Sequence, residues 1–281
     1  MKTSRFHTAS WLSLGLVTLL TTTIHAGTKL QVVHRDLAAG GEPATTTIKI
    51  GEGTLRVHQL NRPEEDLLFQ APAETVWLID HQKKQFYKLT KNDLDGLADQ
   101  VAGAMKQVQE QLANLPPEQR AMVEKMMQAQ MPAGVSLPGA ATPPRTGRWE
   151  KVASGETVGR WTCDHYRYLE GDTVQREVWT APLNTAGIDP SAWTVMTQLG
   201  DLFKGFAEKM PMVIPKDQID PASWDLPPDL RTRAFPVKFV EFNNGQPASE
   251  TVFASIESTS FPADTFAPPE GYQEKSFLGD R

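Results

Sequence analysis

Residues 146–182, TGRWEKVASGETVGRWTCDHYRYLEGDTVQREVWTAP, are the stretch that decides the fold of this 281-residue chain. Tryptophan, tyrosine, valine and threonine recur here between glycines, and these residue types fit the pleated, half-buried surface of a β-sheet. The pattern predicts one strand over 161–169 and a second over 174–180. Between them, Glu170-Gly171-Asp172 predicts a turn in which glycine can adopt a positive φ. The stretch therefore predicts sheet scaffold, and it contains no evident reaction centre.

The first 26 residues are typical of a targeting signal. Lys2 and Arg5 give a positive start, and the mainly apolar run that follows is too short to span a bilayer. Ile24-His25-Ala26 fits a small-residue cleavage site, so we expect the mature chain to begin at Gly27. No cysteine follows the cut, which argues against a lipid anchor. The segment predicts export to the periplasm of a Gram-negative bacterium.

Charge and cysteine content limit the possible classes of function. Loss of Lys2 and Arg5 with the signal reduces 28 basic residues to 26 against 34 acidic ones, so the mature net charge is −8. An acidic chain disfavours nucleic-acid binding, which needs a basic stripe, and charge-driven docking on anionic lipid.

Cys163 is the only cysteine, which excludes an internal disulfide and a metal site built on several thiolates. No later segment is apolar and long enough to be a membrane helix, so we expect no membrane span in the mature chain.

Residues 28–89 predict a meander of short antiparallel strands. The expected strands cover 30–34, 46–50, 55–59, 66–70, 75–80 and 85–89. Apolar and polar residues alternate in several of them, as a half-buried strand requires. The close spacing leaves no room for the crossover helices of a parallel sheet.

The hydrophobic period then changes to that of a helix. The residues that recur every three or four positions are Leu94, Leu97, Val101, Met105, Val108 and Leu112. A second helix is expected from Pro117 to about Gln130, which makes a helical hairpin inserted between strands at about 91–130. Residues 131–145, rich in proline, glycine and alanine, predict a loop. A third helix is expected at about 190–210, after the capping pair Asp189-Pro190.

These elements predict one domain. Asn243-Asn244-Gly245 predicts a hairpin turn, with a returning strand over 252–257. The sequence shows no internal repeat and no linker. Residues 27–281 are therefore expected to form a single α+β domain, an antiparallel sheet with helical insertions.

The order of motifs resembles a group of secreted bacterial proteins. The motifs are the signal, the strand Val76-Trp77-Leu78-Ile79-Asp80, the methionine-rich insertion, Val158-Gly159-Arg160-Trp161-Thr162-Cys163, Glu177-Val178-Trp179-Thr180, and Pro268-Pro269-Glu270-Gly271-Tyr272. Together they resemble an uncharacterised secreted family, a domain of unknown function, similar to the LolA/LolB-like periplasmic lipoprotein carriers. The resemblance implies a curved antiparallel sheet, an open half-barrel, whose concave face is covered by the helices and holds acyl chains. It implies no catalytic residues.

A concavity under a helical lid predicts a binding or carrier protein for a lipid or other apolar ligand. Methionine suits such a lid, because its flexible thioether side chain adapts to ligands of several shapes. The candidate ligand-binding residues are Met105, Met122, Met126, Met127, Trp77 and Trp179. The same methionines could instead pack the hairpin onto the sheet as core, which predicts the same spacing.

Two other hypotheses remain beside the carrier. Thioethers also favour Cu(I), so Met122, Met126 and Met127 on one side of a helix are consistent with a copper-binding protein. A structural envelope protein without a ligand is the third hypothesis.

Catalysis is not expected from the sequence. The chain has no His-Glu-x-x-His, no Gly-x-Ser-x-Gly and no phosphate loop. Asp164 and His165 are adjacent in a strand, so their side chains point to opposite faces and cannot pair directly. We expect no enzymatic activity and no cofactor, and the sequence does not identify a protein partner.

Overall fold

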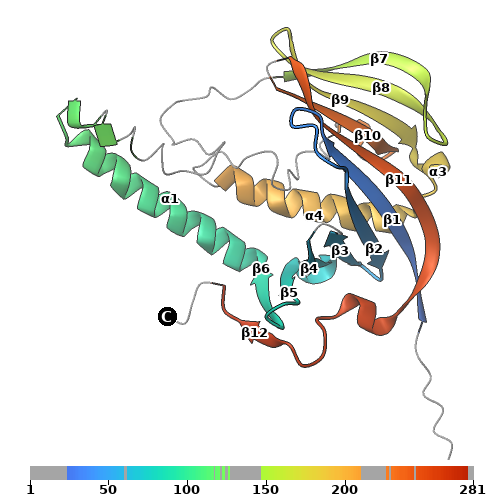
Figure 1. Ribbon diagram of the computed structural model, residues 1–281, viewed down its shortest axis with the longest axis horizontal. Coiled ribbons are helices and arrows are strands. Elements are labelled where there is room, and N and C mark those ends of the chain that lie inside the picture. Colours follow the sequence, from blue (N-terminus) through green and yellow to red (C-terminus); the bar gives the residue numbers. More distant parts are fainter. Residues whose placement is uncertain are drawn as a thin grey trace, which may run out of the picture.

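The computed structural model describes most of the chain (Figure 1). The described residues are 24–59, 62–116, 118–120, 122–123, 126, 147–209, 226–227, 229–243 and 245–277. Most of the expected signal and the loop expected at 131–145 lie outside them.

A single sheet of twelve strands dominates the described part of the chain. The strands are β1 (Ile24–Asp36), β2 (Ala44–Gly51), β3 (Thr54–Gln59), β4 (Arg62–Gln70), β5 (Thr75–Asp80), β6 (Gln85–Thr90), β7 (Gly147–Val158), β8 (Trp161–Glu170), β9 (Thr173–Pro182), β10 (Ala234–Asn243), β11 (Gln246–Pro262) and β12 (Gln273–Lys275). Their order across the sheet is β12-β6-β5-β4-β3-β2-β1-β11-β10-β9-β8-β7. Neighbouring strands are antiparallel except β12 and β6, which are parallel. The predicted antiparallel sheet is confirmed.

In the described part of the chain, helices lie between the strands at four places in the sequence. They are α1 (Lys91–Ala113), α3 (Leu183–Ala186), α4 (Pro190–Lys209) and the 3-10 helices η1 (Ala71–Ala73) and η3 (Ala263–Phe266). α1 begins with a capping box, in which the Thr90 hydroxyl accepts from the Asp93 backbone N–H and the Asp93 carboxylate accepts from the Thr90 backbone N–H. At its other end, the Arg120 guanidinium donates to the carbonyl oxygens of Leu112 and Ala113, 3.0 and 2.9 Å away. This contact satisfies two carbonyls that have no partner inside the helix.

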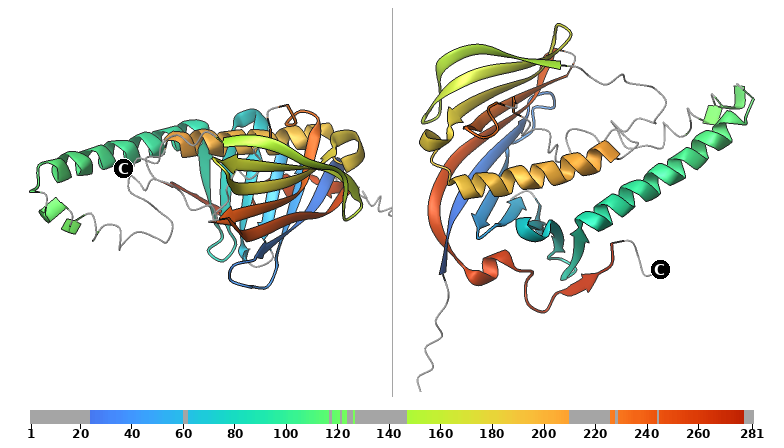
Figure 2. Two further views of the ribbon diagram at one scale, coloured as in Figure 1. Left: turned by 90° about the horizontal axis from the view of Figure 1, so that it is seen from above. Right: turned by 180° about the vertical axis from the view of Figure 1, so that it is seen from behind.

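The main core lies between α4 and the concave face of the sheet (Figures 1 and 2). Apolar residues recur every three or four positions along α4, so one helix face is buried: Ala192, Trp193, Val195, Met196, Leu199 and Leu202. This face packs with central-strand side chains such as Leu30, Phe239 and Phe253, each at most 2% exposed. The centre of the concavity is therefore filled by the protein's own side chains.

The C-terminal segment 261–277, which we call the strap, runs from the end of β11 to the outer edge of β6 (Figure 1). Its root is fixed on the outer face of the sheet, the face opposite α4. The rings of Phe261 and Phe266 contact each other edge to face there, with centroids 5.5 Å apart. They lie over Gly27 and Gly51, where a Cβ atom would come within 2.8 Å of a ring carbon. Glycine is therefore needed at both positions for the strap to approach the sheet.

The expected α+β half-barrel with helical insertions covering the concave face is wrong. Of the described residues, 52% are in strands and 29% in helices, so the protein is a mainly β structure built on one open sheet. α4 packs on the concave face, but α1 contacts β6 and α4 and then extends away from the strands (Figure 1). Along α1 only Leu94 and Ala98 are buried. The physical reason is that α1 meets the sheet at β6, close to the end of the sheet, where only its first turns find a surface to pack on.

Among the described residues, no helix combines the length and the apolar character needed to cross a membrane.

Candidate functional site

Strand register arranges the concave side chains of β3 to β6 in rows that run across the strands. The first row is fully buried, and its members Leu55, Phe69, Val76 and Leu89 are at most 6% exposed. α4 contacts β2, β3 and η1, and the start of α1 contacts β6. The two helices are held together by the Lys209 ammonium, 2.6 Å from an Asp95 carboxylate oxygen.

A second row lies two residues further along each of the same strands, on the same face of the sheet, and we call it the inner apolar row. Val57 pairs with Leu67, Leu67 with Leu78, and Leu78 with Tyr87. All four side chains are only half-buried. Since neighbouring strands are about 4.8 Å apart, the row is an apolar strip about 14 Å long.

The next step along the strands is polar. Glu65 pairs with Asp80, and Asp80 with Gln85. The inner apolar row is therefore bounded by a closed core on one side and by polar side chains on the other. Such an amphipathic step is the arrangement that can hold an apolar chain while leaving a polar end in water.

The end of the strap reaches the last member of this row. The ring of Phe277 contacts that of Tyr87 edge to face, with centroids 5.9 Å apart. Beside this contact is a cavity of about 280 Å³ between β6, the start of α1 and strap residues 274–277. Leu89 of β6 and Asp93 of α1 line this cavity opposite the strap residues.

A buried carboxylate, Asp66, organises the outer face of the same strands. Its side chain is 4% exposed and accepts hydrogen bonds from Arg56 Nε at 2.7 Å and from His58 Nδ1 at 2.7 Å. His81 Nε2 lies 3.1 Å from the same carboxylate. Burial raises the pKa of Asp66, but the hydrogen bonds from His58, His81 and Arg56 outweigh it and hold the pKa below its usual value.

This Asp66 cluster also binds the strap. The second ring nitrogen of His81 lies 2.9 Å from the Tyr272 hydroxyl. The Arg56 guanidinium donates to the backbone oxygen of Thr265 at 3.0 Å. One carboxylate thus connects β3, β4, the β5–β6 turn and the strap. The cluster is a structural clamp, since each of its polar groups is engaged in holding segments together.

At the other end of the sheet, Trp179 stacks on His165 with ring centroids 4.1 Å apart. His165 is 7% exposed and lies between two carboxylates, with Nδ1 3.5 Å from Glu156 and Nε2 3.6 Å from Glu177. These distances are too long for hydrogen bonds. The Lys238 ammonium covers the Trp179 ring at 4.7 Å. The network fixes Trp179 between charged groups, so its ring offers no open apolar surface.

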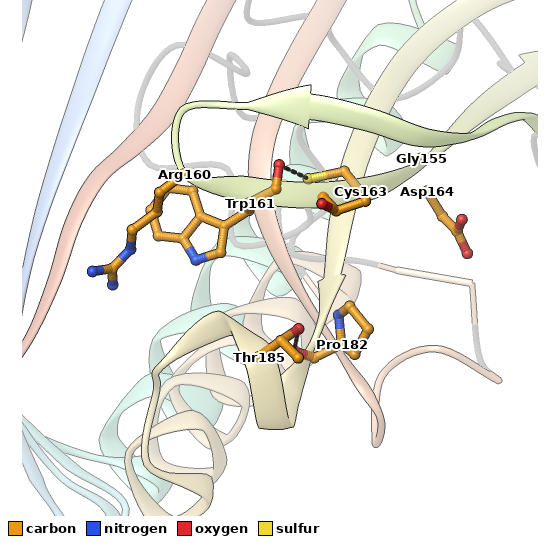
Figure 3. A pocket seen from close by; sticks show the side chains of 8 residues that line it. Gly155, Arg160, Trp161, Cys163, Asp164, Pro182 and Thr185 are labelled. Atoms are coloured by element: carbon orange, nitrogen blue, oxygen red, sulfur yellow. Dashed lines mark hydrogen bonds between the residues drawn. The ribbon is translucent and has the colours of Figure 1, made fainter.

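A second cavity, of about 410 Å³, lies beside α3 and the turn between β7 and β8 (Figure 3). Its charged residues are already paired: Arg160 donates to the carbonyl oxygen of Ile256 at 3.0 Å, and Asp164 accepts from Lys151 at 2.8 Å. Figure 3 shows the side chains of Arg160 and Asp164 directed to opposite sides. Cys163 is 1% exposed, and burial raises the pKa of its thiol to about 11. The thiol therefore stays protonated and is a small buried group.

The structure places the predicted ligand-binding residues apart from one another. Met105 is half-buried on α1, Met122 and Met126 are 68% and 58% exposed, and Met127 lies outside the described residues. Trp77 pairs with Leu68, one position out of step with the inner apolar row, so alternation directs it to the outer face. Trp179 lies on β9, in the other half of the sheet from Trp77, and is partly buried against the core.

The residues of the inner apolar row were missed by our sequence analysis. Alternation along 75–80 and 85–89 places Leu78 and Tyr87 on the opposite face of the sheet from their immediate neighbours in the sequence. The sequence therefore contains a signal that could identify these two residues of the row. It does not show which face α4 covers, because that depends on a contact between distant segments. In the part of the chain that the structure describes, no group of three or more His, Cys, Asp or Glu side chains could hold a metal ion.

Comparisons with known proteins give no family. No family model matches the sequence, and no curated protein matches it significantly. Among solved structures, the chain is similar to that titled "Structure of PNGF-II in P21 space group", with a TM-score of 0.36 and 9% sequence identity. The alignment covers 90% of this chain and 32% of that chain, so this protein spans about a third of the structure it matches. At this TM-score the similarity carries no argument about fold or function.

Proposed function

We propose that the protein is a non-catalytic binding or carrier protein for an apolar ligand, such as the acyl chain of a lipid. The inner apolar row carries this proposal. Val57, Leu67, Leu78 and Tyr87 form a continuous apolar strip that α4 leaves half-exposed, beside a polar row. The site differs from the one expected from the sequence, because it is a surface of the sheet and involves no methionine lid.

The size of the strip fits an extended hydrocarbon chain. A length of about 14 Å accommodates roughly ten methylene groups, and each methylene removed from water contributes about 0.8 kcal/mol. A ligand lying on an open strip is buried on one side only, so roughly half of that stabilisation is expected. Such a site supports reversible binding, which a carrier requires in order to release its ligand.

Export to the periplasm is part of the same proposal. Lys2, Arg5 and the apolar run after them support it, and cleavage after Ala26 leaves most of β1 in the mature chain. Intact-mass measurement of protein from a Gram-negative host tests this expectation. A mature mass that still includes residues 1–26 would contradict it.

Ligand binding is tested on protein purified without detergent. Native mass spectrometry should show co-purified lipid, and a fluorescent fatty acid should bind. Leu67→Glu with Leu78→Glu should reduce the affinity at least ten-fold, because two carboxylates would then lie in the strip. Leu37→Glu is the matched control, since Leu37 is an exposed leucine outside the row, 44% exposed. Equal affinity in all three proteins, or no binding by any of them, would favour the structural role instead.

A further inference from the structure

The strap connects the outer face of the sheet with the inner apolar row. It begins on the outer face at Phe261, passes the edge of the sheet as β12, and ends with Phe277 on Tyr87. A single segment of the chain therefore contacts both the Asp66 cluster and the last residue of the row (Figures 1 and 2).

The two parts of the strap differ in how firmly they are held. Phe261 is 6% exposed and, with Phe266, is seated over Gly27 and Gly51. Beyond η3, residues 270–271 and 273–277 are exposed, and Phe277 is 45% exposed. Segments with few buried apolar contacts open at lower free energy than the core. The strap thus has a fixed root and a weakly buried outer part.

Polar contacts close the outer part onto the sheet. The Tyr272 hydroxyl lies 2.9 Å from His81, and the Gln273 backbone N–H donates to the carbonyl oxygen of Lys84 at 3.0 Å. β12 is a three-residue strand, whose parallel pairing with β6 places Gln273 opposite Gln85. A short edge strand of this kind contributes little stability of its own. Tyr272 is therefore the main side-chain contact by which the Asp66 cluster retains the outer part.

We propose that residues 267–277 form a gate at the β6 edge, which pivots at η3 and controls access to the Tyr87 end of the inner apolar row. Closed, the gate keeps Phe277 on Tyr87 and bounds the 280 Å³ cavity beside Leu89. Open, it exposes the end of the row, so that an apolar chain enters along the strip. This inference rests on the proposed function for its ligand, but the opening itself is a property of the chain.

Locking the gate tests the proposal directly. Gln85→Cys with Gln273→Cys places two thiols at paired positions, where an oxidised disulfide fixes β12 to β6. Native Cys163 is buried and does not compete. The oxidised protein should take up a fluorescent fatty acid at least ten-fold more slowly than the same protein after reduction. Equal uptake rates before and after reduction would overturn the gate.

Releasing the gate gives the complementary test. Tyr272→Phe removes one hydrogen bond, so backbone amides of 270–277 should exchange with deuterium about three- to ten-fold faster, and together. Tyr166→Phe is the control, since its hydroxyl is 3.5 Å from Asp164, away from the strap. Unchanged exchange in Tyr272→Phe would overturn the gate whether or not a ligand binds. Faster exchange with no fatty acid bound by any variant would support the opening of the strap and contradict the ligand function.

Discussion

At the scale of single residues, Asp66 and its partners link β3, β4, the β5–β6 turn and the strap. A buried carboxylate is costly unless it is hydrogen-bonded, and Asp66 contacts Arg56, His58 and His81. Its pKa lies below the ordinary value of 3.8 because these partners outweigh the effect of burial. A lowered pKa means that the charged form stabilises the folded protein. That stabilisation is complete above pH 3.8 and is lost as the pH falls through the lower folded-state pKa.

Replacing Asp66 should therefore change both stability and its dependence on pH. In Asp66→Asn we expect the free energy of unfolding at pH 7 to fall by about 2–3 kcal/mol, because Arg56 loses its charged partner. The loss of stability below about pH 4 should be smaller than in the unmodified protein. Urea unfolding between pH 2.5 and 7 measures both effects. Asp99→Asn, an exposed position on α1, is the control, and equal curves for the two variants would refute the role of Asp66.

At the scale of elements, α1 shows what a hydrophobic period predicts and what it leaves open. Leu94, Val101 and Val108 recur at helical spacing, and the helix extends over all of them. The spacing does not specify a partner for this stripe. In the structure only Leu94 and Ala98 are buried, because α1 meets the sheet at β6 and then leaves it. The methionine lid stays a prediction, because amphipathicity indicates an apolar helix face but does not identify the surface on which that face packs.

Two turns of this helix should accordingly differ in energetic importance. Leu94→Ala creates a cavity at the point where α1 meets β6, and we expect a loss of about 2–3 kcal/mol in the free energy of unfolding. Val108→Ala, on the half-exposed part of the same helix, should cost less than about 1 kcal/mol. Thermal and urea unfolding followed by circular dichroism measure the difference. A loss as large at Val108 as at Leu94 would show that the second half of α1 is packed.

The strands show a second limit of sequence reasoning. Alternation assigns Trp77 and Leu78 to opposite faces, but both faces of β4 and β5 carry buried apolar residues. Leu68 and Ile79 are 0% and 2% exposed on the outer face, and Phe69 and Val76 are 0% and 2% exposed on the concave face. Polarity therefore could not identify the concave face. Only the positions of α4 and the strap, which come from segments more than 100 residues away, decide it.

At the scale of the whole molecule, the pairing of β1 with β11 joins the two wings of the sheet. Its register runs from Ile24 opposite Pro262 to Asp36 opposite Ser249, so the first strand and the last long strand of the described chain form the centre of one sheet. One cluster of buried residues continues from β2 and β3 through α4 to β9 and β10. Because this cluster of described residues crosses the centre of the sheet, the two wings share it. The wings should therefore unfold together.

A substitution at the centre should thus affect both wings equally. Phe253 on β11 is 1% exposed and contacts Phe235 edge to face, with centroids 4.8 Å apart. Phe253→Ala should lower the free energy of unfolding by about 3–5 kcal/mol, whereas Leu37→Ala at an exposed turn should have an effect below about 1 kcal/mol. Tryptophan fluorescence, which reports Trp77 on one wing and Trp179 on the other, should give the same midpoint as far-ultraviolet circular dichroism in both variants. Two separate transitions would mean that the wings are independent units, and a binding strip on β3 to β6 could then form without the rest of the sheet.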